Sequence, residues 1–119
     1  MVKVSVIVPV YNMEKYLGEC LSSLARQTFN DYEVIVINDG STDSSEEIID
    51  YYKKEYPKIF KSYSFKNQGI SKTRNIGIEK ATGEYLTFID SDDYVEKTFL
   101  EEMYNKISVT NSDICVCDY

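Results

Sequence analysis

The chain alternates short apolar, β-branched runs with segments whose apolar residues recur at helical spacing. The first run, residues 2–8, ends at Pro9, and the next apolar side chains, from Tyr16 to Leu24, recur three or four positions apart. A continuous β-branched run is typical of a buried strand, and the spacing that follows is typical of an amphipathic helix. The opening segment therefore predicts a strand, a loop and a helix, in that order.

The same unit follows twice more. A second run, residues 32–37, leads into the turn-forming letters NDGSTD, after which Asp43 and Glu46 have the spacing of a capping box that opens a helix. A weaker strand at residues 60–65 precedes a loop and a helix over residues 71–81, which Gly83 is expected to end.

The last part of the chain predicts a strand at residues 85–89, a helix from Phe99 to Ile107 and a final strand at residues 113–117. Strands that alternate with helices form a parallel sheet with helices on both faces. We therefore expect one α/β, Rossmann-like domain over residues 1–119, with no internal linker.

Composition narrows the class of protein. The chain has 119 residues, 43% of them hydrophobic and 28% charged, which is ordinary for a soluble domain, and its net charge of -7 argues against a nucleic acid partner. The apolar start is too short to span a membrane. We expect a cytoplasmic protein, and membrane association of a full-length protein stays open.

Cysteine usage points to core thiols rather than to a zinc site. The chain has three cysteines and no histidine. Cys115 and Cys117 alternate with Ile114 and Val116, so a strand would direct both thiols to one face. Because a zinc site needs further Cys or His ligands nearby, we expect reduced thiols in the core.

Three carboxylates follow the predicted strand at residues 85–89: Asp90, Asp92 and Asp93. Like charges this close repel, so the cluster is costly unless a cation or a hydrogen-bond donor lies nearby. The alternative is an acidic turn that accepts backbone N–H groups before the next helix. In open α/β sheets ligands bind at the carboxyl ends of the strands, which selects the loops at residues 9–12, 38–43 and 90–93.

Three stretches, VSVIVPVYN, VINDGSTDSS and NQGISKTRNIGIEKATGEYLTFIDSDD, occur in this order and span nearly the whole chain. Together they resemble the nucleotide-sugar-binding half of family 2 glycosyltransferases, which have the GT-A fold. Their order and spacing make the resemblance specific, since a lone D-x-D is common by chance. The resemblance implies inverting transfer of a sugar from a UDP-sugar to a glycan or lipid-linked acceptor, in cell-surface polysaccharide synthesis.

The resemblance also implies roles for the aspartates. Asp92 is expected to be a direct ligand of Mn²⁺ or Mg²⁺, because carboxylate oxygens suit these hard cations. Asp90 is expected near the ribose or the donor sugar and is a second candidate metal ligand, whereas Asp93 could cap the turn. Asp39 resembles the family aspartate that accepts a hydrogen bond from uracil N3–H, a role compatible with an Asx-turn to Gly40.

The first loop matches the family segment that lines the uracil pocket. Pro9 and Val10 would contribute backbone and apolar contacts, and Tyr11 would offer an aromatic face. The alternative is that Pro9 simply ends the strand and that Tyr11 belongs to the core. Glu14 could reach this loop, although a carboxylate in the first turn of a helix is favourable on its own.

The middle stretch matches the family pattern N-x-G followed by an R-N pair, here Asn67, Gly69, Arg74 and Asn75. Gly69 and Arg74 are therefore candidate donor-binding residues. For Arg74 an ion pair with Glu79 or another acid is an alternative.

Family members are generally much longer than this chain, and their acceptor site and catalytic carboxylate lie in the second half. The resemblance therefore implies a truncated GT-A domain that lacks the acceptor half, with no catalytic base among its residues. Such a chain would bind the donor without transferring the sugar by itself. The alternative function is a nucleotide-sugar-binding module that performs no chemistry.

Overall fold

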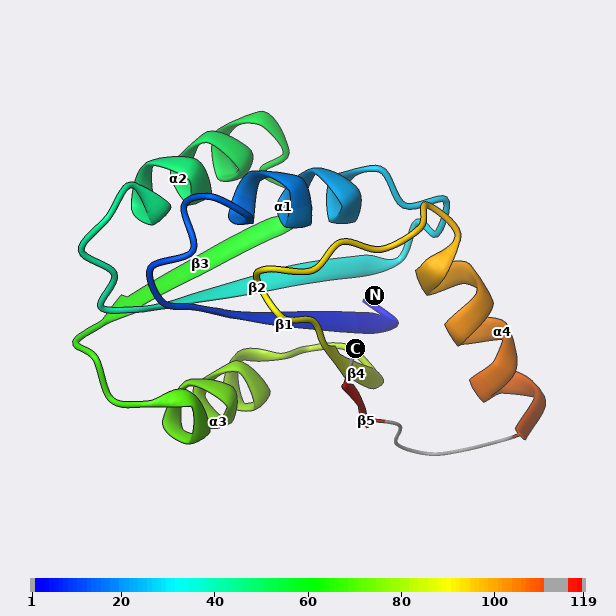
Figure 1. Ribbon diagram of the computed structural model, residues 1–119. Helices are drawn as coiled ribbons and strands as arrows, with labels where there is room; N and C mark the ends of the chain where they lie inside the picture. Colours follow the sequence, from blue (N-terminus) through cyan, green and yellow to red (C-terminus); the bar gives the residue numbers. More distant parts are fainter. Residues whose placement is uncertain (1, 111–115, 119) are drawn as a thin grey trace.

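The computed structural model describes residues 2–110 and 116–118, and side chains are described through residue 106. Figure 1 shows a central sheet between layers of helices. In chain order the elements are β1 (Val4–Val10), α1 (Leu17–Ala25), β2 (Tyr32–Asp39), α2 (Ser45–Glu55), β3 (Phe60–Phe65), α3 (Ile70–Lys80), β4 (Tyr85–Phe88), α4 (Phe99–Thr110) and β5 (Val116–Asp118).

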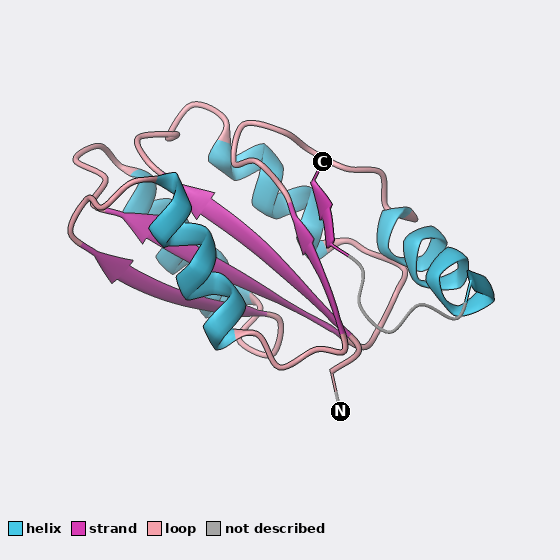
Figure 2. Ribbon diagram, turned by 90° about the horizontal axis from the view of Figure 1, so that it is seen from below, coloured by secondary structure: helices cyan, strands magenta, loops and turns pink. Residues whose placement is uncertain are grey.

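All strand pairs are parallel, and the strand order is β3-β2-β1-β4-β5. The chain moves outward from β1 to β3 and then returns to place β4 on the other side of β1, so the switch in strand order lies between β1 and β4. Helices α1 and α2 cover one face, and α3 crosses the other (Figures 1 and 2). The predicted α/β architecture, with helices on both faces, is confirmed.

The core explains the unbroken apolar runs. Every residue of β1 and β2 is buried, as expected for central parallel strands that are covered on both faces. The predicted face of α1 packs against them, with Leu17, Leu21 and Leu24 fully buried. Among residues 2–110, no helix combines the length and the apolar character needed to cross a bilayer.

The predicted capping box is wrong, because the N-cap of α2 is Ser44, which makes no side-chain cap hydrogen bond. The Asp43 carboxylate accepts a hydrogen bond from the Ser45 N–H, at 2.9 Å, and so stabilises the start of α2. Glu46 does not return to the helix start. Its carboxylate accepts hydrogen bonds from the Asn38 side chain and from the Ser64 hydroxyl, so it ties α2 to β2 and β3 instead.

Gly83 is needed for a different reason from the one predicted. Helix α3 ends at Lys80 with Ala81 as its cap, two residues before this glycine. A Cβ on Gly83 would lie 2.8 Å from the backbone nitrogen of Ser5, so the turn after α3 must approach β1 without a side chain.

The last predicted elements are described only in part. Strand β5 pairs with β4, in agreement with the prediction of a final strand, but residues 113–115 lie outside the described residues. The side chains of Ile107, Cys115 and Cys117 also lie outside them. Cys20 is a free, buried thiol, as expected for a core cysteine.

A buried carboxylate joins three strands at the amino end of the sheet. Glu33 in β2 is 1% exposed and accepts hydrogen bonds from the Ser5 hydroxyl at 2.6 Å, the Lys61 ammonium at 2.7 Å and the Thr82 N–H at 2.8 Å. Burial by itself would raise the pKa of Glu33, but the hydrogen bonds from Lys61, Ser5 and Thr82 outweigh it and lower the pKa below its ordinary value of 4.5.

Removal of this carboxylate should destabilise the fold in a pH-dependent way. Glu33→Ala leaves several donors without an acceptor, and we expect the free energy of unfolding at neutral pH to fall by about 2 kcal/mol or more. A lowered folded-state pKa gives stability that is present above the ordinary value and is lost as the pH falls through the folded-state value. Glu33→Gln should therefore flatten the acid side of the profile. Urea unfolding across acidic and neutral pH, with the exposed Glu47→Ala as the control, tests this, and an unchanged profile would contradict it.

Candidate functional site

A cavity of about 420 Å³ opens at the carboxyl end of the sheet, where the loops after β1, β2, β3 and β4 converge. It lies on the side where β1 and β4 separate. Its lining residues are Pro9, Val10, Tyr11, Met13, Asp39, Asn67, Gly69, Ile70, Thr73, Asp90, Ser91 and Asp92.

The end of β1 forms one wall. Strand β1 pairs with β4 only as far as Ile7, and Pro9 lies beyond that point while still aligned with Ile37 of β2. Because β1 has no strand on its β4 side there, a residue without an N–H group is tolerated. Val10 is buried, whereas Tyr11 is 48% exposed. The interpretation of Tyr11 as a core residue is therefore wrong, and Tyr11 lies in the cavity wall.

Asp39 holds the loop after β3 against the loop after β2. It is 5% exposed, and its two carboxylate oxygens accept backbone N–H groups from Gln68 at 2.7 Å and Gly69 at 3.1 Å. The Asn67 amide donates to the Asp39 carbonyl at 3.2 Å, which gives Asn67 a role that its motif did not reveal. Each carboxylate oxygen has a second lone pair, so Asp39 keeps acceptor capacity toward the cavity.

The expected Asx-turn from Asp39 to Gly40 is wrong, because the Asp39 carboxylate binds Gln68 and Gly69 instead, and a neighbouring residue closes the turn three positions on. Asn38, rather than Asp39, accepts the N–H group of Ser41, at 3.1 Å. Gly40 sits inside this turn with φ +72°, and a Cβ there would lie 2.6 Å from the Asn67 backbone nitrogen. The three residues therefore have different roles. Asn38 closes the turn, Asp39 binds the loop after β3, and Gly40 lets that loop pack closely.

The acidic cluster lies across the cavity, after the buried Ile89. One carboxylate oxygen from each of Asp90, Asp92 and Asp93 lies within 4.8 Å of the other two, and the Asp93 N–H closes the turn onto the Asp90 carbonyl at 3.0 Å. Asp90 and Asp92 line the cavity. A set of carboxylate oxygens at this spacing fits Mg²⁺ or Mn²⁺, and such a cation would offset their mutual repulsion.

A thiol lies beneath this cluster. The Cys20 Sγ is 3.7 Å from the Asp90 carbonyl oxygen, to which it donates. Burial, together with the charges of Asp93, Asp92 and Asp90, raises the pKa of Cys20 to about 12. The thiol is therefore neutral, and its hydrogen bond to the Asp90 carbonyl supports the turn.

Two further residues occupy different positions from those expected. Arg74 is not among the described residues that line the cavity. Its guanidinium lies over the ring of Phe88, 5.3 Å from the centroid. Helix α1 begins at Leu17, so Glu14 precedes the helix instead of lying in its first turn. The Glu14 carboxylate accepts the Ser44 N–H from the neighbouring loop, at 3.2 Å.

Helix α3 supplies lining residues that the motifs did not indicate. Ile70 and Thr73 occupy its first turn, and the Thr73 hydroxyl donates back to the Gly69 carbonyl at 2.8 Å. Their position in the sequence could have indicated them, because the first turn of a helix lies at the same edge of the sheet as the carboxyl-end loop that precedes it.

Comparison with known proteins gives one consistent result. The family model Glycosyl transferase family 2 matches residues 5–119. The chain is 44% identical over 117 residues to Glycosyltransferase GlyA of Streptococcus pneumoniae serotype 4 (strain ATCC BAA-334 / TIGR4), covering 98% of this chain and 17% of that protein.

Solved structures agree. S. aureus TarS 1-349 in complex with UDP-GlcNAc superposes with a TM-score of 0.85 at 41% identity, covering 93% of this chain and 32% of that chain. The mannosyltransferase PcManGT from Pyrobaculum calidifontis, solved with GDP-Man and Mn²⁺, shares the fold with a TM-score of 0.83 at 23% identity and covers 89% of this chain and 32% of that chain. The chain thus spans about a third or less of the length of these proteins. With the family model matched from residue 5 to residue 119, the chain belongs to glycosyltransferase family 2 and has its GT-A fold.

Proposed function

We propose that the cavity binds a UDP-sugar, and that residues 1–119 are the donor-binding part of an inverting glycosyltransferase acting on a glycan or lipid-linked acceptor in cell-surface polysaccharide synthesis. The observation that carries the proposal is the layout of one cavity, with the buried Asp39 carboxylate on one side and Asp90 and Asp92 on the other. This layout offers separate ends for a base and a diphosphate. The similarity to TarS, which was crystallised with UDP and with UDP-GlcNAc, supports it.

The base end consists of Tyr11 and Asp39, with Pro9 and Val10 behind them. The remaining lone pairs of the Asp39 carboxylate accept the N3–H group of uracil, and the exposed Tyr11 ring contacts the face of the base. The backbone bonds from Gln68 and Gly69 keep the carboxylate oriented, so the recognition atom needs no reordering when the ligand binds.

The diphosphate end consists of the acidic cluster. Asp92 is the proposed direct ligand of Mn²⁺ or Mg²⁺, and Asp90 is the second ligand or a contact to the ribose. When bound, the cation supplies Lewis-acid neutralisation of the diphosphate charge. The negative net charge of -7 opposes binding of an anionic donor, and such neutralisation would offset it.

The acceptor side is not assigned to these carboxylates. All three aspartates that line the cavity have a role toward the donor in this proposal, so the base that takes the proton of the acceptor hydroxyl is a different group. Gly69 belongs to the donor-binding wall. Arg74 remains a proposed donor contact, which would require its guanidinium to leave the ring of Phe88.

The metal assignment predicts that UDP binds more tightly with Mn²⁺ than with a chelator. We expect a gain of about tenfold or more, which corresponds to about 1.4 kcal/mol. Asp92→Ala should remove most of the gain, whereas Glu96→Ala, which removes an exposed carboxylate near the cluster but outside the cavity, should keep it. Isothermal titration calorimetry measures both. Equal UDP affinity with Mn²⁺ and with the chelator would rule out the assignment.

The base assignment predicts that UDP binds more tightly than CDP. Cytosine presents an unprotonated N3, so a CDP complex sets two acceptors against each other at a cost of ~1–3 kcal/mol. Asp39→Asn should reduce the UDP preference, and Asp31→Asn, an exposed change at the amino end of β2, should not alter it. Competition binding gives the ratio. If CDP competes as well as UDP in the unsubstituted protein, Asp39 does not read the base.

A further inference from the structure

The loops after β1 and β2 exchange hydrogen bonds in both directions. The Asn12 N–H donates to the Ser41 hydroxyl at 3.0 Å, and the Thr42 N–H donates back to the Asn12 side-chain oxygen at 2.8 Å. Each loop thus supplies a backbone donor and a side-chain acceptor to the other.

A second reciprocal pair follows two residues later. The Glu14 N–H donates to the Asp43 carboxylate at 3.1 Å, and the Ser44 N–H donates to the Glu14 carboxylate at 3.2 Å. Between the two pairs, the Met13 N–H donates to the buried Ser45 hydroxyl at 3.1 Å. We call these five bonds, between residues 12–14 and residues 41–45, the loop clasp.

The clasp provides the hydrogen bonds that hold the backbone of residues 12–14. Both loops have bonds of their own: the loop after β2 has those from Ser41 to Asn38 and from Ser45 to Asp43, and in the loop after β1 the N–H groups of Tyr16 and Leu17 donate to the Met13 carbonyl. The loop after β2 also packs against the loop after β3. In the loop after β1, the N–H groups of residues 12–14 all donate to side chains of the other loop. We conclude that the second loop anchors the backbone of residues 12–14.

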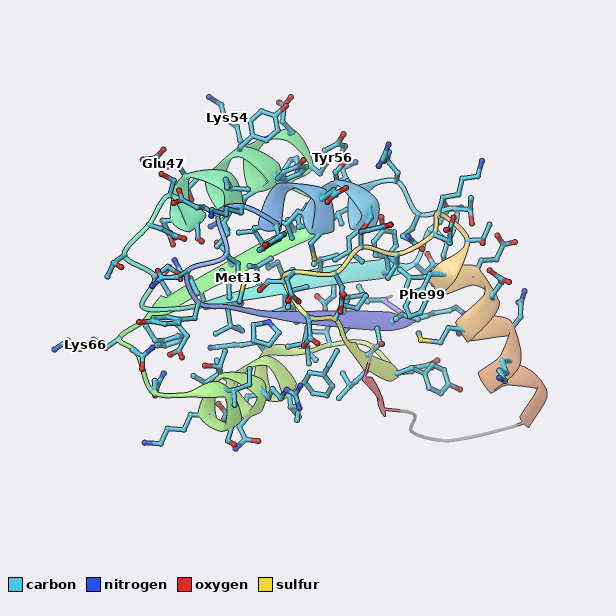
Figure 3. The ribbon with its side chains drawn as sticks, in the orientation of Figure 1. Met13, Glu47, Lys54, Tyr56, Lys66 and Phe99 are labelled. Atoms are coloured by element: carbon cyan, nitrogen blue, oxygen red, sulfur yellow. The ribbon has the colours of Figure 1, made fainter. Side chains whose placement is uncertain are left out.

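The anchoring of residues 12–14 also affects the position of Tyr11. It immediately precedes Asn12, whose φ of +50° turns the chain sharply at this point. Tyr11 is 48% exposed, so core packing contributes little to its placement. Met13, on the other side of Asn12, lies between the loop and the sheet (Figure 3) and packs against the core. The clasp therefore sets where Tyr11 stands relative to Asp39.

We propose that Asn12, Glu14 and Asp43 are positioning residues that hold Tyr11 in place over the base, an inference that rests on the proposed function. Four of the five bonds are exposed to solvent, and such bonds contribute only modestly to global stability. Their effect falls on binding, because a loop that is already ordered costs less to immobilise when the ligand arrives.

The first test compares UDP affinity among single substitutions by calorimetry with Mn²⁺ present. Loss of one such bond corresponds to a roughly 2–10-fold weaker affinity, expected for Glu14→Ala. Asn12→Gly, which tolerates the positive φ but loses the acceptor, should show the same loss. Glu14→Gln keeps a side-chain oxygen for the Ser44 N–H and should bind as the unsubstituted protein does. Glu47→Ala, on the outer side of α2 (Figure 3), is the matched control.

The decisive test repeats Glu14→Ala in a Tyr11→Ala background. If the clasp acts by placing Tyr11, the second substitution should weaken UDP binding no further, and thermal unfolding should show that all variants remain folded. An equal loss in both backgrounds, or no loss from Glu14→Ala in the first, overturns the inference while the proposed function stands. Absence of UDP binding in the unsubstituted protein would instead overturn the proposed function, and the inference with it.

Discussion

The separation of β4 from β1 is the constraint on which the site depends. Strand β1 pairs with β2 along its whole length, but it pairs with β4 only from Val4 to Ile7. Beyond that point the two strands lead into different loops, and the space between their carboxyl ends is not filled by a sheet neighbour. The cavity lies there, with the end of β1 as one wall and the acidic cluster after β4 opposite Asp39. An uninterrupted sheet would leave no room for a ligand at this position.

Backbone N–H groups determine which carboxylates serve the fold and which remain available to a ligand. Glu33 and Asp43 accept N–H groups from neighbouring loops, and both have pKa values below the ordinary range. For Asp43, burial acts to raise the pKa, and the hydrogen bonds from Ser45 and Glu14 more than compensate for it. Asp39 combines both roles, because two N–H groups hold its oxygens while its carboxylate lines the cavity. The chain is acidic, yet Asp39 and Asp43 are stabilised locally by N–H dipoles, whereas Glu33 also has the Lys61 ammonium as a partner.

Much of the fold was predictable because the strands and helices carry strong local signals. The unbroken runs of β1 and β2 and the spacing of Leu17, Leu21 and Leu24 follow from burial on one or both faces. The position of the cavity was predictable too, since the carboxyl ends of parallel strands share one edge. The partners of polar side chains were not. That Glu46 bonds to Ser64, and that Gly83 approaches Ser5, depends on the register between segments far apart in the chain, which periodicity does not encode.

The hydrogen-bond network of Glu33 and the cavity lie at opposite ends of the sheet. Glu33 and Asp39 both lie in β2, six residues apart, so about 20 Å of strand separates the amino-end network from the cavity that Asp39 lines. Substitutions separated by more than about 7–10 Å, with no shared partners, have additive effects on free energy. Strands β1 and β2 are buried along their whole length, whereas the loops at their carboxyl ends keep accessible side chains such as Tyr11. The chain can therefore hold four loops around one cavity without placing the stability of the sheet in those loops.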